Sequence, residues 1–220
     1  AGETVRARSK FMTRKDDGTW KFMTDVKFEE ALVGSAGKAT WSPLGTLELD
    51  ADDNLASVAG KRLDGKLFSA QARHMAWLQN GELSLSGNVT AWRQSADEKQ
   101  LLRLWAEEAS LLQSSGWAKG YVKFELDQNR GKANYADWVL DQGEFTVHLE
   151  GNAQLQSADG SAEGHCITRD PQFLTVEALA PATAKLNLTD GRKILSPWIQ
   201  WDHLFLLLAT RAAVVEGQSH

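Results

Sequence analysis

One short phrase occurs twice in this chain, and it constrains the fold more than any single side chain does. The phrase is an alternating apolar segment that ends in Gly-Asn, and its copies run over residues 81–89 and 143–153. An alanine- and tryptophan-containing segment precedes each copy, with Trp77 before the first and Trp138 before the second. A short strand unit that recurs in this way buries its apolar face only by stacking on its neighbours. The repeat therefore predicts a repetitive β architecture.

Alternation of apolar and polar residues continues through much of the chain, as expected for half-buried strands. Clear examples lie at residues 20–28, 47–50, 83–89, 122–127, 145–155 and 186–188. Turn-forming sequences separate them, namely Asp17-Gly18, Asp64-Gly65, Asn80-Gly81, Asn129-Arg130-Gly131, Asp159-Gly160 and Asp190-Gly191. We predict an antiparallel meander of hairpins that forms one domain over residues 1–193, followed by a tail of unclear structure over residues 194–220.

Two segments fit either a helix or a strand. Ser95 and Glu98 have the spacing of a capping box, and leucines follow at helical intervals. The alanines of the same region are placed like those of the neighbouring unit, so we favour a strand over Leu104–Val122. For Trp198–Val215 a terminal strand and a short amphipathic helix remain equally open.

Charge and cysteine content exclude several classes of protein. The formal net charge of −5 gives no basic footprint for a nucleic-acid partner. The single cysteine, Cys166, excludes an internal disulfide framework and a cysteine-rich zinc site. Residues 1–20 are too charged for the apolar part of a signal peptide, and the run Leu204–Ala209 is far shorter than the ~20 residues of a membrane span. We therefore expect a soluble chain without a leader or anchor of its own.

The reactive side chains do not form a pattern that predicts catalysis. His148 lies on the polar parity of its segment, where a solvated or hydrogen-bonded role is expected. His165 and Cys166 are adjacent, so a strand would point them to opposite faces. The sequence contains no Gly-x-Ser-x-Gly elbow, phosphate-binding loop or dinucleotide fingerprint. We expect a protein that is not an enzyme and that uses neither a cofactor nor a metal.

The repeat does align apolar side chains into a strip. In stacked sheets the apolar parity of successive strands forms one continuous surface, which is either a packed core or the wall of a groove. The pattern by itself favours the packed core. The residues predicted to form this strip are Leu83, Leu85, Val89, Phe124, Leu126, Phe145, Val147 and Leu149.

Two stretches carry a resemblance to a known family. They are LSLSGNV at residues 83–89 and LEGNA at residues 149–153, each after an alanine-marked segment such as residues 133–138. In order and repetition they resemble the OstA-like repeat of the periplasmic lipopolysaccharide-transport proteins of the LptA and LptC group. The resemblance covers about residues 68–190, with a fainter copy over residues 18–50.

The resemblance implies both a fold and a function. The expected fold is an elongated, twisted, slightly open β-jellyroll whose interior holds acyl chains, with the strip described above as its lining. The expected function is that of a periplasmic carrier or bridge for lipopolysaccharide, or a related amphiphile, on its way to the outer membrane. Other OstA-like transport proteins, or a second copy of the chain, would dock through the terminal edge strands. Basic side chains that could meet lipid phosphates, if they are not simply solvated, are Lys61, Arg62, Lys66, Arg73 and Arg93.

The nine tryptophans keep a second class of function open. Trp77 and Trp138 recur at equivalent positions of the repeat, which indicates a packing role. Trp92, Trp198 and Trp201 are free to act as surface platforms that stack on sugar rings. A carbohydrate-binding β-sandwich is thus the alternative to the lipid carrier, and a glycosidase is the weakest possibility because no convincing carboxylate pair is present.

Overall fold

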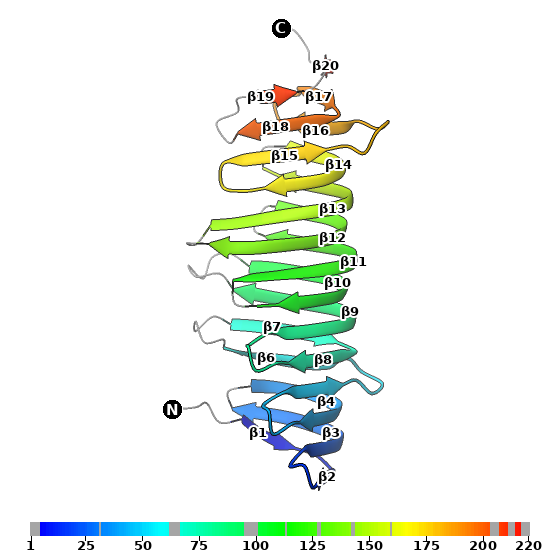
Figure 1. Ribbon diagram of the computed structural model, residues 1–220, viewed down its shortest axis with the longest axis vertical. Helices are drawn as coiled ribbons and strands as arrows, with labels where there is room; N and C mark the ends of the chain where they lie inside the picture. Colours follow the sequence, from blue (N-terminus) through cyan, green and yellow to red (C-terminus); the bar gives the residue numbers. More distant parts are fainter. Residues whose placement is uncertain are drawn as a thin grey trace. The chain divides into compact units, whose positions relative to one another are not determined.

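A computed structural model of the chain describes residues 5–30, 32–61, 67–94, 101–112, 114–126, 129–141, 144–158, 160–202, 207–210 and 214–216. Every regular element in these ranges is a β-strand, and each strand ladder is antiparallel (Figure 1). The predicted all-β, antiparallel class is confirmed. None of the described segments forms a helix that is long and apolar enough to cross a membrane.

The chain divides into two compact units, Ala1–Gln113 and Ser114–His220. The strands of the first unit are β1 (Val5–Arg8), β2 (Phe11–Arg14), β3 (Trp20–Glu30), β4 (Leu32–Trp41), β5 (Leu47–Asp50), β6 (Ala56–Lys61), β7 (Leu67–Ala72), β8 (His74–Trp77), β9 (Leu83–Gln94) and β10 (Leu101–Leu111). Those of the second unit are β11 (Ser115–Leu126), β12 (Asn129–Asp141), β13 (Glu144–Ser157), β14 (Gly160–Arg169), β15 (Phe173–Glu177), β16 (Ala184–Leu188), β17 (Lys193–Ser196), β18 (Trp198–Asp202), β19 (Leu207–Thr210) and β20 (Val214–Glu216).

Each long strand of the first unit bends in the middle, so that its two halves belong to different layers. Layer A contains β1, β6 and β7 with one half of β3, β4, β9 and β10. Layer B contains β2, β5 and β8 with the other half of the same four strands. The layers face each other, since the rings of Phe68 in layer A and Trp77 in layer B meet edge to face at 5.5 Å.

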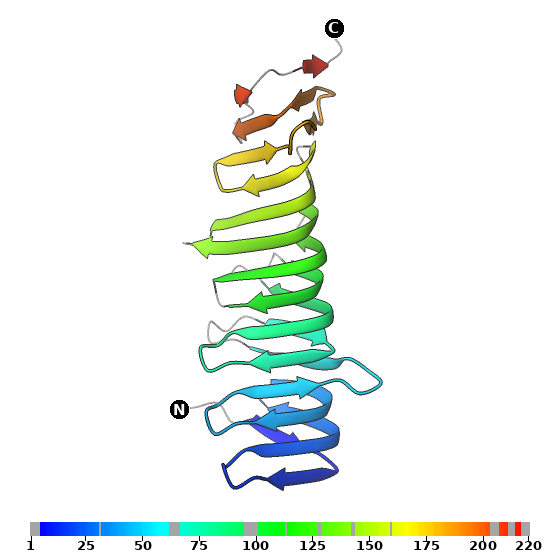
Figure 2. The same cartoon turned by 45° about the vertical axis from the view of Figure 1, so that its right-hand side comes forward.

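The second unit repeats this plan. Its layer A contains β16, β17 and β20 with the second halves of β11 and β13 and the first halves of β12 and β14. Its layer B contains β15, β18 and β19 with the remaining halves. In both views β13 appears as a curved ribbon that passes from one layer to the other (Figures 1 and 2). Each unit is therefore a sandwich that is joined along one side by the bends of its own strands.

The Gly-Asn phrases form these bends. In β13 the φ angles of Gly151 and Asn152 are +76° and +52°, and in β9 those of Gly87 and Asn88 are +78° and +53°. The ladder registers shift at the same places, as they do at β-bulges. Left-handed backbone is readily adopted by glycine and tolerated by asparagine. The recurring phrase is therefore a corner within a strand, and apolar parity resumes beyond it.

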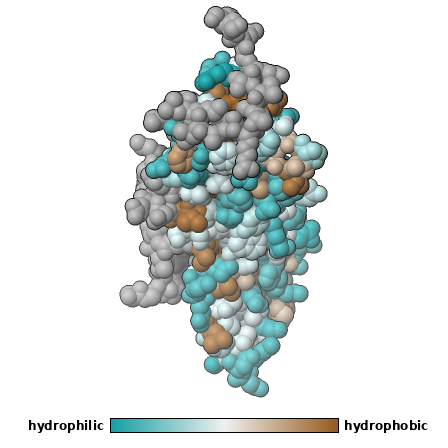
Figure 3. All heavy atoms as spheres, turned by 45° about the horizontal axis from the view of Figure 1, so that its top comes forward, coloured by the Kyte–Doolittle hydropathy of each residue, from teal (hydrophilic) through white to brown (hydrophobic). Residues whose placement is uncertain are grey.

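The core of each unit lies between its layers. Side chains on the inner parity are buried on both sides of a corner, for example Leu85 and Val89 in β9, and Leu149 and Ala153 in β13. Outer positions carry charged or polar residues, and in Figure 3 the apolar side chains on the visible face stand as separate spots among polar ones. The largest fully buried side chains include Phe28, Met75 and Ile167.

The sequence-based element boundaries are partly confirmed. Asp17-Gly18, Asn80-Gly81 and Asp190-Gly191 form hairpin turns in which the acidic or amide side chain accepts a backbone N–H two residues later. The turn predicted at Asn129-Arg130-Gly131 is wrong, because all three residues lie in β12. Asp64-Gly65 and Asp159 lie outside the described residues.

The two ambiguous segments are strands wherever they are described. Residues 101–111 form β10, while Ser95 and Glu98 lie outside the described residues. The single strand predicted over Leu104–Val122 is instead two, because β10 ends at Leu111 and β11 begins at Ser115. The tail contributes β18, β19 and β20 rather than a helix, and the predicted boundary at residue 193 falls inside the ladder between β16 and β17.

Candidate functional site

The side of the second unit away from its corners carries a row of inward-facing side chains. Successive ladder partners in layer B are Trp138, Val147, Arg169, Leu174 and Trp201, contributed by β12, β13, β14, β15 and β18. We call these five residues the rim row. Each shares the parity of a buried neighbour in its own strand, such as Leu149 beside Val147 or Ile167 beside Arg169. Trp201 is almost fully buried, whereas the other four are half-buried.

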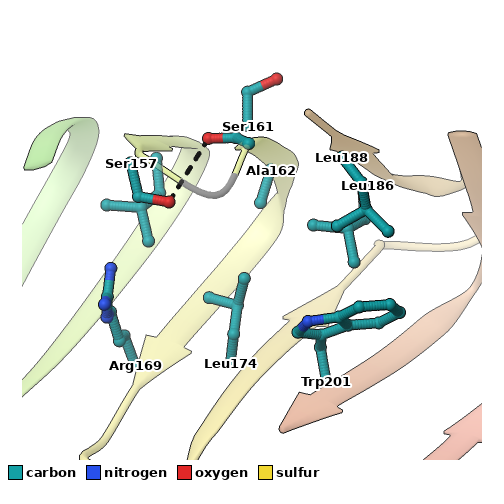
Figure 4. A pocket seen from close by; sticks show the side chains of 10 residues that line it. Ser157, Ser161, Ala162, Arg169, Leu174, Leu186, Leu188 and Trp201 are labelled. Atoms are coloured by element: carbon teal, nitrogen blue, oxygen red, sulfur yellow. Dashed lines mark hydrogen bonds between the residues drawn. The ribbon is translucent and has the colours of Figure 1, made fainter. Parts of the chain in front are cut away.

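A small cavity lies between layer A and three residues of the rim row, Arg169, Leu174 and Trp201 (Figure 4). Its apolar wall consists of Leu155, Ala162, Leu186 and Leu188 from layer A and of Leu174 and Trp201 from layer B, and the other lining residues are Ser157, Gly160, Ser161 and Arg169. Its volume is about 30 Å³. That space holds about one water molecule, so in this conformation the interior at this point is too small for an acyl chain.

A hydrogen bond from Arg169 joins the two layers at this cavity. Arg169 is the charged member of the rim row, and its Nη1 donates a hydrogen bond of 2.7 Å to Oδ1 of Asn129 at the start of β12. The arginine belongs to layer B and the asparagine to layer A. The guanidinium therefore lies at the opening between the layers, with its aliphatic stem along the apolar wall.

The first unit has an equivalent row. Ladder partners in its layer B are Trp20, Trp41, Leu47, Trp77 and Leu83. The guanidinium of Arg14 lies 5.5 Å above the ring of Trp20 at one end of this row. Trp20 and Trp41 are each 36% exposed, while Leu83 at the other end is buried. Five of the nine tryptophans thus occupy the same structural position in one unit or the other, at the edge of an apolar interior.

The eight side chains predicted to line an apolar strip divide between the units. Leu83, Leu85 and Val89 lie in the first unit and are buried. In the second unit Leu149 and Phe124 are buried, Leu126 and Val147 are half-buried, and the side chain of Phe145 lies outside the described residues.

Phe124 illustrates how the described interior is filled. It pairs directly with Gly131 across the β11–β12 ladder. A Cβ atom at Gly131 would lie only 1.9 Å from Cε1 of the phenylalanine ring. The ring therefore packs onto the backbone of the glycine, in the manner by which aromatic residues cover glycines in sheets.

The polar candidates have structural partners. Nδ1 of His148 lies 2.9 Å from Oγ1 of Thr168, its cross-strand neighbour. Burial raises the pKa of the Cys166 thiol, and the carboxylates of Glu150 and Glu177 on the two flanking strands raise it further. A raised pKa leaves less thiolate, which is the nucleophilic form. Within the described ranges no three His, Cys, Asp or Glu side chains gather in a way that could hold a metal ion.

The tryptophans proposed as sugar platforms differ from one another. Trp201 is only 4% exposed and lines the cavity, so a role as a surface platform is wrong for this residue. Trp92 is 37% exposed on the outer parity of β9, and Trp198 is half-buried on the outer parity of β18. Of the basic residues considered for lipid phosphates, Arg73 is exposed and Arg93 half-buried, while the side chains of Lys61, Arg62 and Lys66 lie outside the described residues.

Sequence reasoning did not select Arg169 or the rim rows. Parity offered a signal, because Arg169 follows the buried Ile167 by two residues and so occupies an inward position. The alignment of rim residues from separate hairpins depends on the register of the ladders between those hairpins. This register could not be predicted from the sequence. No protein-family model matches the chain, and no curated protein is similar enough to it to indicate a relationship.

Proposed function

We propose that this protein is a periplasmic carrier that binds the acyl chains of lipopolysaccharide, or of a related amphiphile, between its layers during export to the outer membrane. The observation that carries the proposal is the architecture of each unit, an apolar interior that is closed by strand corners on one side and rimmed by tryptophan on the other. Tryptophan suits such a boundary, because its ring is apolar and its N–H seeks water or a polar group. The resemblance of the Gly-Asn phrases to the OstA-like repeat points to the same function.

Binding of a chain between the layers requires the rim to open. The cavity of about 30 Å³ is a starting point, and the layers would separate at the rim while the corners hold them together. Each buried methylene contributes about 0.8 kcal/mol, so a chain of twelve carbons supplies on the order of 10 kcal/mol against the cost of opening. Transfer of the ligand along such a trough needs no covalent step in this chain.

The proposal includes partners that dock by strand addition. All four residues of β2 are exposed, and two of them, Phe11 and Met12, are apolar. Among the described strands β2 forms a ladder with β3, and the backbone groups of its other edge would be a template for another strand. The proposed partners are other OstA-like transport proteins or a second copy of this chain.

Replacing Val147 by aspartate tests the acyl site. Val147 faces inward in the rim row, and a carboxylate there would have to be desolvated whenever an acyl chain binds. We expect V147D to weaken binding of purified lipopolysaccharide at least about tenfold, measured by crosslinking or native mass spectrometry. The delipidated polysaccharide should not bind the unaltered protein.

The matched control is Val139→Asp. Val139 belongs to the same layer but faces outward and is 49% exposed, so V139D should bind lipopolysaccharide like the unaltered protein. Equal binding by V147D and V139D would contradict the acyl site. Binding of the delipidated polysaccharide, lost on replacing Trp198, would instead support the carbohydrate alternative.

A further inference from the structure

Arg169 is the charged member of the rim row, whose four other members are apolar. Its ladder partners in layer B are Val147 on β13 and Leu174 on β15. It also lines the cavity, where Figure 4 shows its side chain beside Leu174 and below Ser157. If Arg169 only covered the cavity, a leucine or methionine would do so equally well. Either residue would avoid the free-energy cost of desolvating the charge of the guanidinium.

Among the described residues no carboxylate pairs with the guanidinium, whose side-chain partner there is the neutral Asn129. Asn129 is a neutral acceptor, and a guanidinium has five N–H donors arranged as a fork that fits phosphate or carboxylate oxygens. The carboxylate next to it in sequence serves a different purpose. Oδ1 of Asp170 accepts the backbone N–H groups of Gln172 and Phe173, at 2.7 and 2.6 Å, in the turn between β14 and β15.

We propose that Arg169 binds the phosphate of an acyl amphiphile whose chain enters the cavity between Leu174, Leu186 and Trp201. This inference rests on the proposed function and specifies the chemical class of its ligand. The phosphate replaces Asn129 as the acceptor of the guanidinium, and the hydrogen bond that joins the two layers breaks as the ligand enters. A charge-assisted, bidentate contact is substituted for a neutral one, which favours the exchange.

The replacement of Asn129 by the ligand's phosphate also links recognition of the phosphate to separation of the two layers. The Arg169–Asn129 bond is a polar contact that spans the layers at this cavity, and the acyl chain needs these layers to separate. A phosphate that captures Arg169 removes the contact and supplies the ligand in the same event. A neutral amphiphile of equal chain length has to separate the layers without this compensation, so it binds more weakly.

The test compares amphiphiles that share a chain and differ in the head group. Binding of dodecyl phosphate, dodecyl maltoside and inorganic phosphate to the full chain is measured by titration calorimetry below the micelle concentration. We expect dodecyl phosphate to bind about tenfold more tightly than dodecyl maltoside, the difference that one charge-assisted contact provides. Inorganic phosphate, which lacks the chain, should bind at least about a hundredfold more weakly than dodecyl phosphate.

Three variants assign that preference to Arg169. Arg169→Gln should abolish it and leave dodecyl maltoside binding within about twofold of the unaltered protein. Asn129→Asp keeps the arginine paired and thus protects the fold, yet its carboxylate competes with the phosphate, so it should abolish the preference as well. Arg130→Gln is the control, because Arg130 is exposed beside Asn129 and pairs with Glu125 at 3.7 Å. This variant should keep the preference.

The outcomes separate the two proposals. Equal affinity for the two amphiphiles, or a preference that persists in both R169Q and N129D, would overturn the role of Arg169 while the acyl carrier stands. If R130Q lost the preference for dodecyl phosphate as fully as R169Q, the preference would reflect the overall charge of the protein. This result would also overturn the role of Arg169. Inorganic phosphate that binds as tightly as dodecyl phosphate would show a site for free phosphate. Failure of both amphiphiles to bind would overturn the carrier together with the inference.

Discussion

In β13 the chain turns from layer B to layer A through Gly151 and Asn152, and the two residues are not equivalent. A Cβ atom at Gly151 would lie 2.8 Å from Nδ2 of Asn134 on the neighbouring strand, so the exposed Asn134 side chain would have to shift, and the new residue would have to adopt a φ of +76°. Asn152 is exposed, so its side chain meets no such limit. The first position of the corner therefore favours glycine for both its φ and the nearby Asn134 side chain, and the second is limited by its left-handed backbone alone.

Gly151→Ala should destabilise the chain by about 1–2 kcal/mol, the usual cost of forcing a residue with a Cβ atom into left-handed backbone. Urea unfolding monitored by tryptophan fluorescence would measure the change. Asn152→Gly, which suits the same backbone, is the comparison and should change stability by less than about 0.5 kcal/mol. Equal effects of the two substitutions would contradict this account of the corner.

The Cys166 thiol gives a prediction that depends on pH. Its pKa is raised by burial and by the carboxylates of Glu150 and Glu177, so the thiolate forms only at a higher pH than in an unfolded chain. Alkylation by iodoacetamide should therefore be slower in the folded protein at every pH below this pKa, and the rate should rise as the pH increases through it. Glu150→Gln should lower the pKa and increase the rate at pH 8 a few-fold. A rate in the folded protein equal to that in urea would be inconsistent with the raised pKa.

All four residues of β2, which forms a ladder with β3, are exposed. Phe11 pairs with Met23 across this ladder, and these side chains are 62% and 37% exposed. An exposed apolar pair on a short strand is a surface that association would cover. The element is thus suited to docking, whereas β13, which pairs with β12 and β14, is suited to form the interior.

Phe11→Lys should weaken self-association of the chain, if β2 adds to a strand of a second copy. Sedimentation velocity over a range of protein concentrations would measure the change, and we expect the dimer dissociation constant to rise about tenfold. Leu44→Lys is a matched control, since Leu44 is 73% exposed in the turn between β4 and β5 and is not part of β2. A monomer at all concentrations, or an equal effect of both substitutions, would exclude docking of a second copy through β2.

For the molecule as a whole, the sequence predicted the parts that depend on local pattern. Alternation predicted strands and inward parity, so Leu85, Val89 and Leu149 lie in the interior as expected. The Gly-Asn phrases indicated a repeat, but their role as corners depends on the φ of two successive residues, which a turn-like sequence does not reveal. The rim rows depend on register between hairpins, so the alignment of Arg169 with Val147 and Leu174 could not be predicted, although alternation with Ile167 indicates that Arg169 faces inward. The division into two units at residue 113 has no marker in composition.

The corner also bears on how a chain of this kind changes in length. Gly87, Gly120 and Gly151 follow one another at intervals of about thirty residues, and each begins a left-handed pair within a long strand. One such interval contains the parts that a further hairpin needs to pair with the sandwich. These parts are a corner, a set of inward-facing residues and a residue at the rim of each layer. If a whole interval were duplicated or deleted, the remaining strands would therefore keep the same residues facing inward and their corners would still align. Insertion of a single residue within a strand would move every side chain between the insertion and the next turn to the opposite face of the sheet. Whole-hairpin changes are thus the route by which relatives of different length could arise from this sequence.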